Sequence, residues 1–131
     1  MFTDRDDREA PAQHSGLIKL SGPLNVNISV YRGDSGRFRI TVYDIGGDPV
    51  DLTGATWDAD IRVKASDVDV ITNFEVVPVV DDPASVEVIL SAENSELLPS
   101  TCVYDVEMRQ LEEVHTLITG TITVTQDVSR P

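Results

Sequence analysis

The chain has 131 residues, of which 40% are hydrophobic but only 5% aromatic, and its formal net charge is −13. This length suits one domain, whose core must be built mainly from Val, Ile and Leu. The charge argues against nucleic acids and anionic membranes as partners, because both are bound through Lys and Arg. The single cysteine, Cys102, excludes an internal disulfide, and its apolar surroundings predict a buried structural thiol.

Residues 1–16 form a polar segment without hydrophobic periodicity, which we interpret as an extended N-terminal arm preceding a domain at 17–131. An ordered arm would need contacts with a partner, and Phe2, Arg5 and Arg8 are its predicted partner-binding residues. The sequence shows neither the apolar run of a signal peptide nor a stretch of membrane-spanning length. We therefore expect the protein to be made and kept in a cytoplasm.

From Leu17 onward apolar and polar residues alternate with a period of two, which indicates half-buried strands. A more continuously apolar stretch at 68–80 is predicted to be a bent or bulged strand, which Pro78 pushes toward a sheet edge. The pattern predicts an all-β protein, an antiparallel immunoglobulin-like β-sandwich. The expected core includes Trp57, Ile61, Val88, Tyr104 and Val106. The alternating runs lie at 26–30, 38–42, 57–63, 86–90, 104–108 and 118–124.

The connections contain turn residues. The sequence "RGDSG" at 32–36 contains an integrin-binding tetrapeptide, but an integrin ligand needs export. We interpret it as a hairpin turn, in which Gly33 and Gly36 supply positive φ angles. A short helical turn is predicted at 91–99, capped by Ser91 and ended by Pro99.

Two positions in the later strands have a structural interpretation. Tyr104, which follows Leu98-Pro99 at the start of a strand, is either the hydroxyl donor of a tyrosine corner or an ordinary core tyrosine. Gly120 in the middle of a strand indicates a bulge or a close approach of another backbone segment.

No pattern of catalytic residues is present, so we expect no enzyme, no cofactor and no small-molecule substrate. His14 and His115 have no partners in a triad-like arrangement. The acidic residues between 44 and 82 favour a solvated acidic face. They are also compatible with Ca²⁺ binding, although the spacing of an EF-hand is missing, so the sequence leaves open whether the protein binds a metal ion. Arg32, Arg37 and Arg39 form the one basic cluster, which could face an acidic surface of another copy. The acidic residues between 44 and 82 are Asp44, Asp48, Asp51, Asp58, Asp60, Asp67, Asp69, Glu75, Asp81 and Asp82.

Several segments in a fixed order carry a resemblance to a known family. They are "YRGDSGRFRITVYD", "DPVDLTGATWDADIR", "YDVEM" and "TLITGTITVTQDVSRP", and the resemblance covers roughly residues 24–130. The order resembles the LtfC-like β-sandwich family of small bacteriophage tail and baseplate proteins.

The resemblance implies a structural virion subunit with no catalysis and no cofactor, present in multiple copies and bound to other tail subunits. Such a subunit would be assembled in the host cytoplasm and belong to the tail tip, the baseplate or a fibre attachment. The alternatives are a capsid decoration protein and a carbohydrate-binding module, of which the latter requires exposed aromatic residues on one face.

Overall fold

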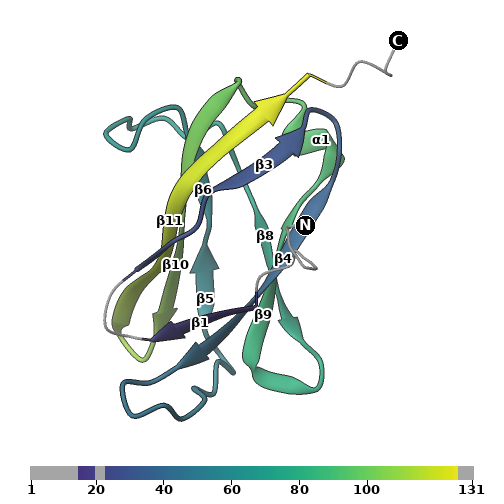
Figure 1. Ribbon diagram of the computed structural model, residues 1–131. Coiled ribbons are helices and arrows are strands. Elements are labelled where there is room, and N and C mark those ends of the chain that lie inside the picture. The colour runs from purple at the N-terminus through teal and green to yellow at the C-terminus, as the bar shows by residue number, and fades with distance from the viewer. Residues whose placement is uncertain (1–14, 20–22, 127–131) are drawn as a thin grey trace.

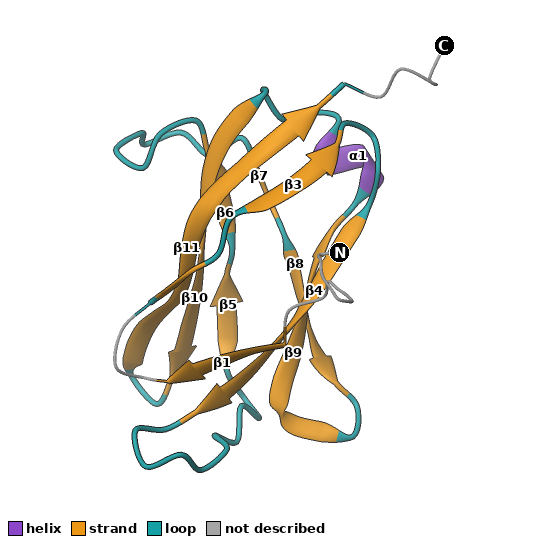
Figure 2. Cartoon of the chain, viewed as in Figure 1, coloured by secondary structure: helices purple, strands orange, loops and turns teal. Residues whose placement is uncertain are grey.

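The computed structural model describes residues 15–19, by their backbone alone, and residues 23–126. This part of the chain folds into two β-sheets and one short helix (Figures 1 and 2). The predicted all-β class is confirmed. No helix in this part of the chain has the length and apolar character needed to cross a membrane.

The first sheet has four strands in the order β1-β4-β9-β8. At its centre, β4 (Gly36–Tyr43) and β9 (Asp82–Leu90) pair antiparallel, with Phe38 opposite Val88. The edge strand β8 (Glu75–Val79) contains Pro78 and an irregular register next to it, as predicted for a residue that cannot donate a backbone hydrogen bond. The other edge strand, β1 (Ser15–Lys19), begins two residues before the boundary predicted at Leu17.

The second sheet has seven strands and is built around the long hairpin of β10 (Thr101–Gln110) and β11 (Glu113–Thr125). On one side, β11 pairs with β2 (Leu24–Asn25) and β3 (Ile28–Tyr31). On the other side, β10 pairs with β5 (Thr56–Asp58) and β6 (Asp60–Arg62). The strand β7 (Thr72–Asn73) then pairs with β6, and the chain crosses to the first sheet at the buried Phe74.

The expectation of purely antiparallel sheets is wrong. Strand β1 runs parallel to β4, and both β2 and β3 run parallel to β11. Alternation with a period of two identifies a strand and its buried face but says nothing about the direction of its neighbours. The three parallel pairings all involve the first three strands.

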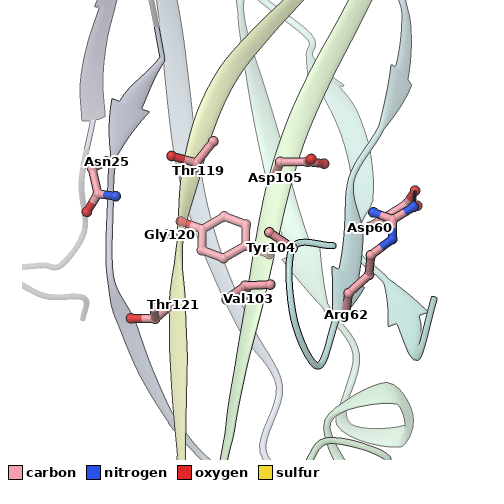
Figure 3. A pocket seen from close by; sticks show the side chains of 10 residues that line it. Asn25, Asp60, Arg62, Val103, Tyr104, Asp105, Thr119, Gly120 and Thr121 are labelled. Carbon is pink, nitrogen blue, oxygen red and sulfur yellow. Dashed lines mark hydrogen bonds and ion pairs between the residues drawn. The ribbon is translucent and has the colours of Figure 1, made fainter. Parts of the chain in front are cut away.

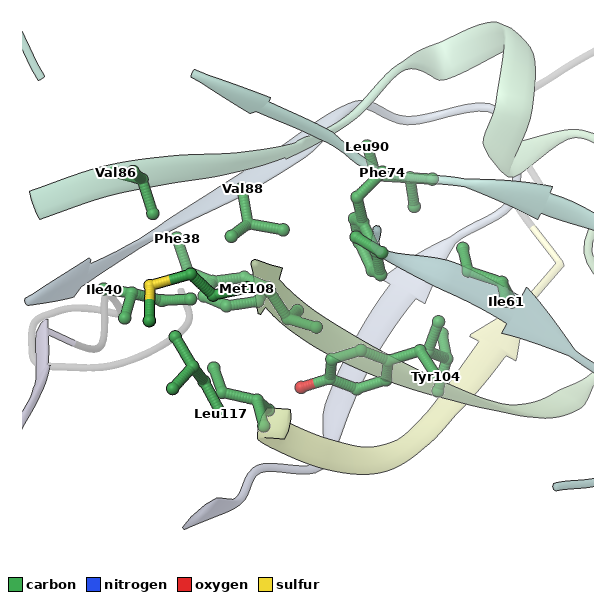
Figure 4. Packing of buried hydrophobic residues seen from close by; sticks show 14 of the residues in the cluster. Phe38, Ile40, Ile61, Phe74, Val86, Val88, Leu90, Tyr104, Met108 and Leu117 are labelled. Atoms are coloured by element: carbon green, nitrogen blue, oxygen red, sulfur yellow. The ribbon is translucent and has the colours of Figure 1, made fainter. Parts of the chain in front are cut away.

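The core lies between the two sheets (Figure 4). The rings of Phe38, Phe74 and Tyr104 meet edge to face with centroids 5.3 to 6.4 Å apart, and aliphatic side chains from both sheets surround them. Burial at the centre of the strands agrees with the predicted alternation. Among the fully buried side chains are Ile40, Val86, Val88, Ile61, Val106, Met108, Leu117 and Ile122.

One position of the predicted core, Trp57, and one inward position of the alternating run at 57–63, Val63, are corrected. Trp57 is half-buried and packs against the rim of the core, because β5 is a three-residue strand at the margin of the sheet. Val63 lies beyond the end of β6 and is 49% exposed. Ile61, Val88, Tyr104 and Val106 are buried as predicted. The alternation of residues 57–63 therefore continues past the strands that the chain actually forms.

Gly120 allows a close approach between segments. A Cβ atom at Gly120 would lie 1.8 Å from the carbonyl oxygen of Val26 and 3.1 Å from a ring carbon of Tyr104. The connection between β2 and β3 is held there by the Val26 amide, which donates to the Thr119 carbonyl (2.9 Å). The predicted close backbone approach is confirmed, whereas the β-bulge of this hairpin lies at Leu117, the residue without a cross-strand partner.

Candidate functional site

The "RGDSG" segment links two sheets instead of forming the predicted hairpin, because β3 belongs to the seven-stranded sheet and β4 to the four-stranded sheet. Gly33 has a φ of 92°, as predicted, but Gly36 is in ordinary extended backbone. The Gly33 amide donates to the hydroxyl of Ser95 (2.8 Å), a fully buried residue of α1 (Ala92–Ser95). Ser91 caps this helix as predicted, through a hydrogen bond from the Asn94 amide.

Arg32 stabilises the same crossing. Its Nε and Nη2 atoms donate to the carbonyl oxygen of Leu98 at 3.2 and 3.0 Å, and its Nη1 atom donates to Gln126 Oε1 at 2.7 Å. The guanidinium group thus joins the turn after β3, the segment after α1 and the end of β11. This arrangement gives Arg32 a structural role within the chain.

The three arginines predicted as one basic cluster have separate environments. Arg37 pairs with Glu87 (2.9 Å) and Arg39 with Asp82 (3.0 Å), both across the four-stranded sheet from β4 to β9. Each guanidinium is therefore at least partly neutralised within the chain. The other predicted partner-binding residues, Phe2, Arg5 and Arg8, lie outside the described residues.

A pocket of about 270 Å³ opens on the outer face of the seven-stranded sheet. Figure 3 shows Asn25 of β2 on one side of this pocket and Asp60 and Arg62 of β6 on the other, with Asp105 of β10 between them. The outer face is polar because every second residue of β10 and β11 points away from the core. The lining residues are Asn25, Asp60, Arg62, Ala65, Val103, Tyr104, Asp105, Thr119, Gly120 and Thr121.

Asp105 is the unusual group of this pocket. Burial raises the pKa of its carboxyl group, and the nearby carboxylates of Asp60, Glu107 and Asp58 add to this effect, which Arg62 partly opposes. The neighbouring acids have ion-pair partners: Arg62 lies 3.4 Å from Asp60, and Arg109 bridges Asp58 (3.2 Å) and Glu107 (2.8 Å). The pocket therefore presents acceptor oxygens and threonine hydroxyl groups, which suit a cationic or hydroxyl-bearing group of a partner.

The described residues do not form a metal-binding cluster. No group of three His, Cys, Asp or Glu side chains in residues 15–19 and 23–126 is arranged to hold a metal ion. His115 pairs with Glu113 (3.0 Å) on an exposed stretch of β11, and His14 lies outside the described residues. Cys102 is fully buried, and burial raises the pKa of its thiol to about 11, as expected of a structural cysteine.

The residues of "DLTG" at 51–54 form a turn. The Asp51 carboxylate accepts a hydrogen bond from the Thr53 amide (3.0 Å), and hydrogen bonds from Thr53 lower the pKa of Asp51. Leu52 is buried, and Gly54 has a φ of 84°. The motif is thus explained by the local fold.

The connections at one end of the two sheets carry exposed aliphatic residues that the alternation pattern does not reveal. We call this region the loop end and define it as residues 44–55, 80–83 and 111–113, which Figure 1 shows at the lower end of the view. Ile45, Val80 and Leu111 are 73%, 95% and 90% exposed. The one sequence signal for them is an aliphatic residue at a turn, where polar residues are usual.

Comparison with known proteins leaves the family open. No protein-family model matches the chain, and no curated protein matches it. Among solved structures, that of Listeria monocytogenes InlP is similar, with 10% sequence identity and a TM-score of 0.43. The match covers 88% of this chain and 28% of that one, so the chain spans less than a third of InlP. At this TM-score the likeness carries no argument about function.

Proposed function

We propose that the protein is a structural subunit of a bacteriophage virion, related to the LtfC-like tail proteins and built on an immunoglobulin-like β-sandwich. In this role it belongs to the tail tip, the baseplate or a fibre attachment, in several copies per particle. It is assembled in the host cytoplasm and acts through protein–protein contacts.

The observation that supports this proposal most directly is the exposure of large aliphatic side chains at the tips of connections. Ile45, Val80 and Leu111 are at least 73% exposed, each in a different connection. A single exposed aliphatic residue, such as Val68 in the connection between β6 and β7, needs no explanation. Several of them at one end of the molecule are what a subunit that is covered in an assembly would carry. The residues of the sequence resemblance support the family assignment separately.

The carbohydrate-binding alternative has little support in the described residues. Tyr31, 55% exposed at the end of β3, is the one exposed aromatic residue there, and it does not line the pocket on the seven-stranded sheet. Sugar-binding faces usually offer an aromatic platform to the apolar side of the sugar ring. No described feature favours capsid decoration over a tail position.

The proposal is tested by locating the protein in purified virions. Antibodies raised against the isolated domain should detect it in particles purified through a density gradient, and immunogold labelling should place it on the tail. Its absence from washed particles that contain the major capsid protein would overturn the proposal. Labelling confined to the head would favour the decoration alternative.

The arm has its own test. Deletion of residues 2–14 leaves β1, which begins at Ser15, intact. If Phe2, Arg5 and Arg8 bind a neighbouring subunit, the truncated protein should melt at an unchanged temperature but be incorporated poorly into particles. Normal incorporation would show that these three residues are dispensable for assembly.

A further inference from the structure

The loop end is held as one surface by hydrogen bonds between its connections. Gln110 Nε2 donates to the carbonyl oxygens of Asp51 (2.9 Å) and Thr53 (3.2 Å), which ties the turn after β10 to the connection after β4. The Leu52 amide donates to the Pro83 carbonyl (2.8 Å), which ties the same connection to the start of β9. Because its parts are already fixed, this surface would lose little conformational freedom on binding.

Leu111, in the turn between β10 and β11, suits neither the backbone conformation nor the solvent exposure of its position. Leu111 and Glu112 have φ angles of 52° and 67°, and they are the non-glycine residues with positive φ in residues 15–19 and 23–126. Two-residue turns of this kind favour Asn-Gly or Asp-Gly. A leucine that is strained and also 90% exposed is better explained by a contact than by the stability of the isolated chain.

The charge of the loop end restricts its partner. Residues 44–55, 80–83 and 111–113 include no Lys or Arg. A second copy of this chain is disfavoured at this surface, because each copy carries a formal net charge of −13. Two acids of the loop end already have partners outside it, since Asp82 pairs with Arg39 and Glu113 with His115. The other acids are Asp44, Asp48, Asp51, Asp81 and Glu112.

We propose that the loop end is the docking surface of this protein for a different subunit. The partner surface has apolar recesses that receive Leu111, Val80 and Ile45, and lysine or arginine residues at its rim that face the surrounding acids. This inference deepens the proposed function and rests on it for the partner being a virion subunit.

The first test removes the apolar anchor without weakening the turn. The double substitution Leu111→Asn with Glu112→Gly introduces the residues that such a turn favours. We expect its incorporation into purified particles, quantified by immunoblot, to fall about tenfold, a typical effect of losing one anchor side chain, while its melting temperature does not fall. Val68→Asn is the matched control, because Val68 is 91% exposed in the connection between β6 and β7, and its incorporation should equal that of the wild type.

The second test addresses charge. Asp81→Lys reverses a charge in the loop end, and Asp69→Lys makes the same change in the connection between β6 and β7. Asp81→Lys should reduce incorporation, and Asp69→Lys should not. Wild-type incorporation of both loop-end variants, with the wild-type protein present in particles, would overturn the inference and leave the proposed function standing.

A third measurement keeps the two proposals separable. If the wild-type protein is absent from virions, the proposed function is wrong. The docking surface can still be tested by itself, through photo-crosslinking in the cells that produce the protein. A photoreactive residue at position 111 and one at position 80 should each crosslink to the same protein through a Lys- or Arg-containing segment, whereas one at position 68 should not. The lack of a shared product from positions 111 and 80 would overturn the docking surface.

Discussion

The hydroxyl group of Tyr104 donates a hydrogen bond of 2.7 Å to the carbonyl oxygen of Val26, 78 residues earlier in the chain. A tyrosine corner would bond to backbone only a few residues upstream, so Tyr104 is a core tyrosine with a long-range partner. Gly120, opposite Tyr104 on β11, leaves the space that this contact needs. The three residues together hold the connection between β2 and β3 against the β10–β11 hairpin.

Substitution of Gly120 by alanine should destabilise the protein by about 3 kcal/mol, because the added methyl group collides with backbone and forces it to move. The Cβ atom would lie 1.8 Å from the Val26 carbonyl oxygen. Urea unfolding followed by tryptophan fluorescence measures the effect. Gly36→Ala is the control, since a Cβ there meets nothing within 4 Å, and equal stability losses in the two variants would refute this account.

Asp105→Asn should stabilise the protein near neutral pH. The pKa of Asp105 is raised by burial, so the folded state binds its proton more tightly than the unfolded state, and the ionised form opposes folding. This penalty is fully present above the folded-state pKa and disappears as the pH falls below the unfolded value near 3.8. The stability gain of the variant, measured by urea unfolding between pH 4 and pH 7, should therefore shrink toward the acid end.

The control for Asp105 is Asp81→Asn, which makes the same change in net charge in an exposed turn. A similar gain in both variants would assign the effect to net charge instead of to the burial of Asp105.

Arg32→Lys should cost about 2 kcal/mol of folding free energy, because lysine cannot reproduce the forked contact with the Leu98 carbonyl and the Gln126 side chain. Arg37→Lys should change stability by less than about 0.5 kcal/mol, since its guanidinium is largely solvated in a surface ion pair. Thermal unfolding of the two variants decides this. Equal effects would mean that the contacts of Arg32 add little to stability.

The thiol of Cys102 should not react with a disulfide reagent in the folded protein at pH 8. It is fully buried, and its pKa of about 11 leaves little thiolate. One equivalent should react after unfolding in guanidinium chloride. Rapid labelling under native conditions would show that β10 opens locally at this position.

The hydrophobic alternation was sufficient to predict the strands and their buried faces, but it failed at the strand ends. The segments around Val88 and Val106 follow the pattern because long antiparallel neighbours hold each strand in its sheet, where one of its faces packs against the opposite sheet. Trp57 and Val63 depart from it because β5 and β6 end within three residues.

The prediction that three arginines form one basic cluster was wrong for a related reason. Proximity in sequence does not reveal that Arg32 turns toward Leu98 while Arg37 and Arg39 face the acids of β9.

The sequence by itself determined the all-β class, the buried thiol and the capped helical turn, because these depend on local periodicity and on residue types that cap helices. It marked Gly120 as unusual, but the reason for glycine there is the approach of the distant Val26 backbone. The tertiary structure alone decided the parallel pairing of β1, β2 and β3 and the crossing of the "RGDSG" segment between sheets. It also decided that the connections at 44–55, 80–83 and 111–113, which carry the exposed Ile45, Val80 and Leu111, lie at one end of the sheets. These features depend on which distant segments become neighbours, and the free energy of long-range packing, which no local pattern contains, selects those neighbours.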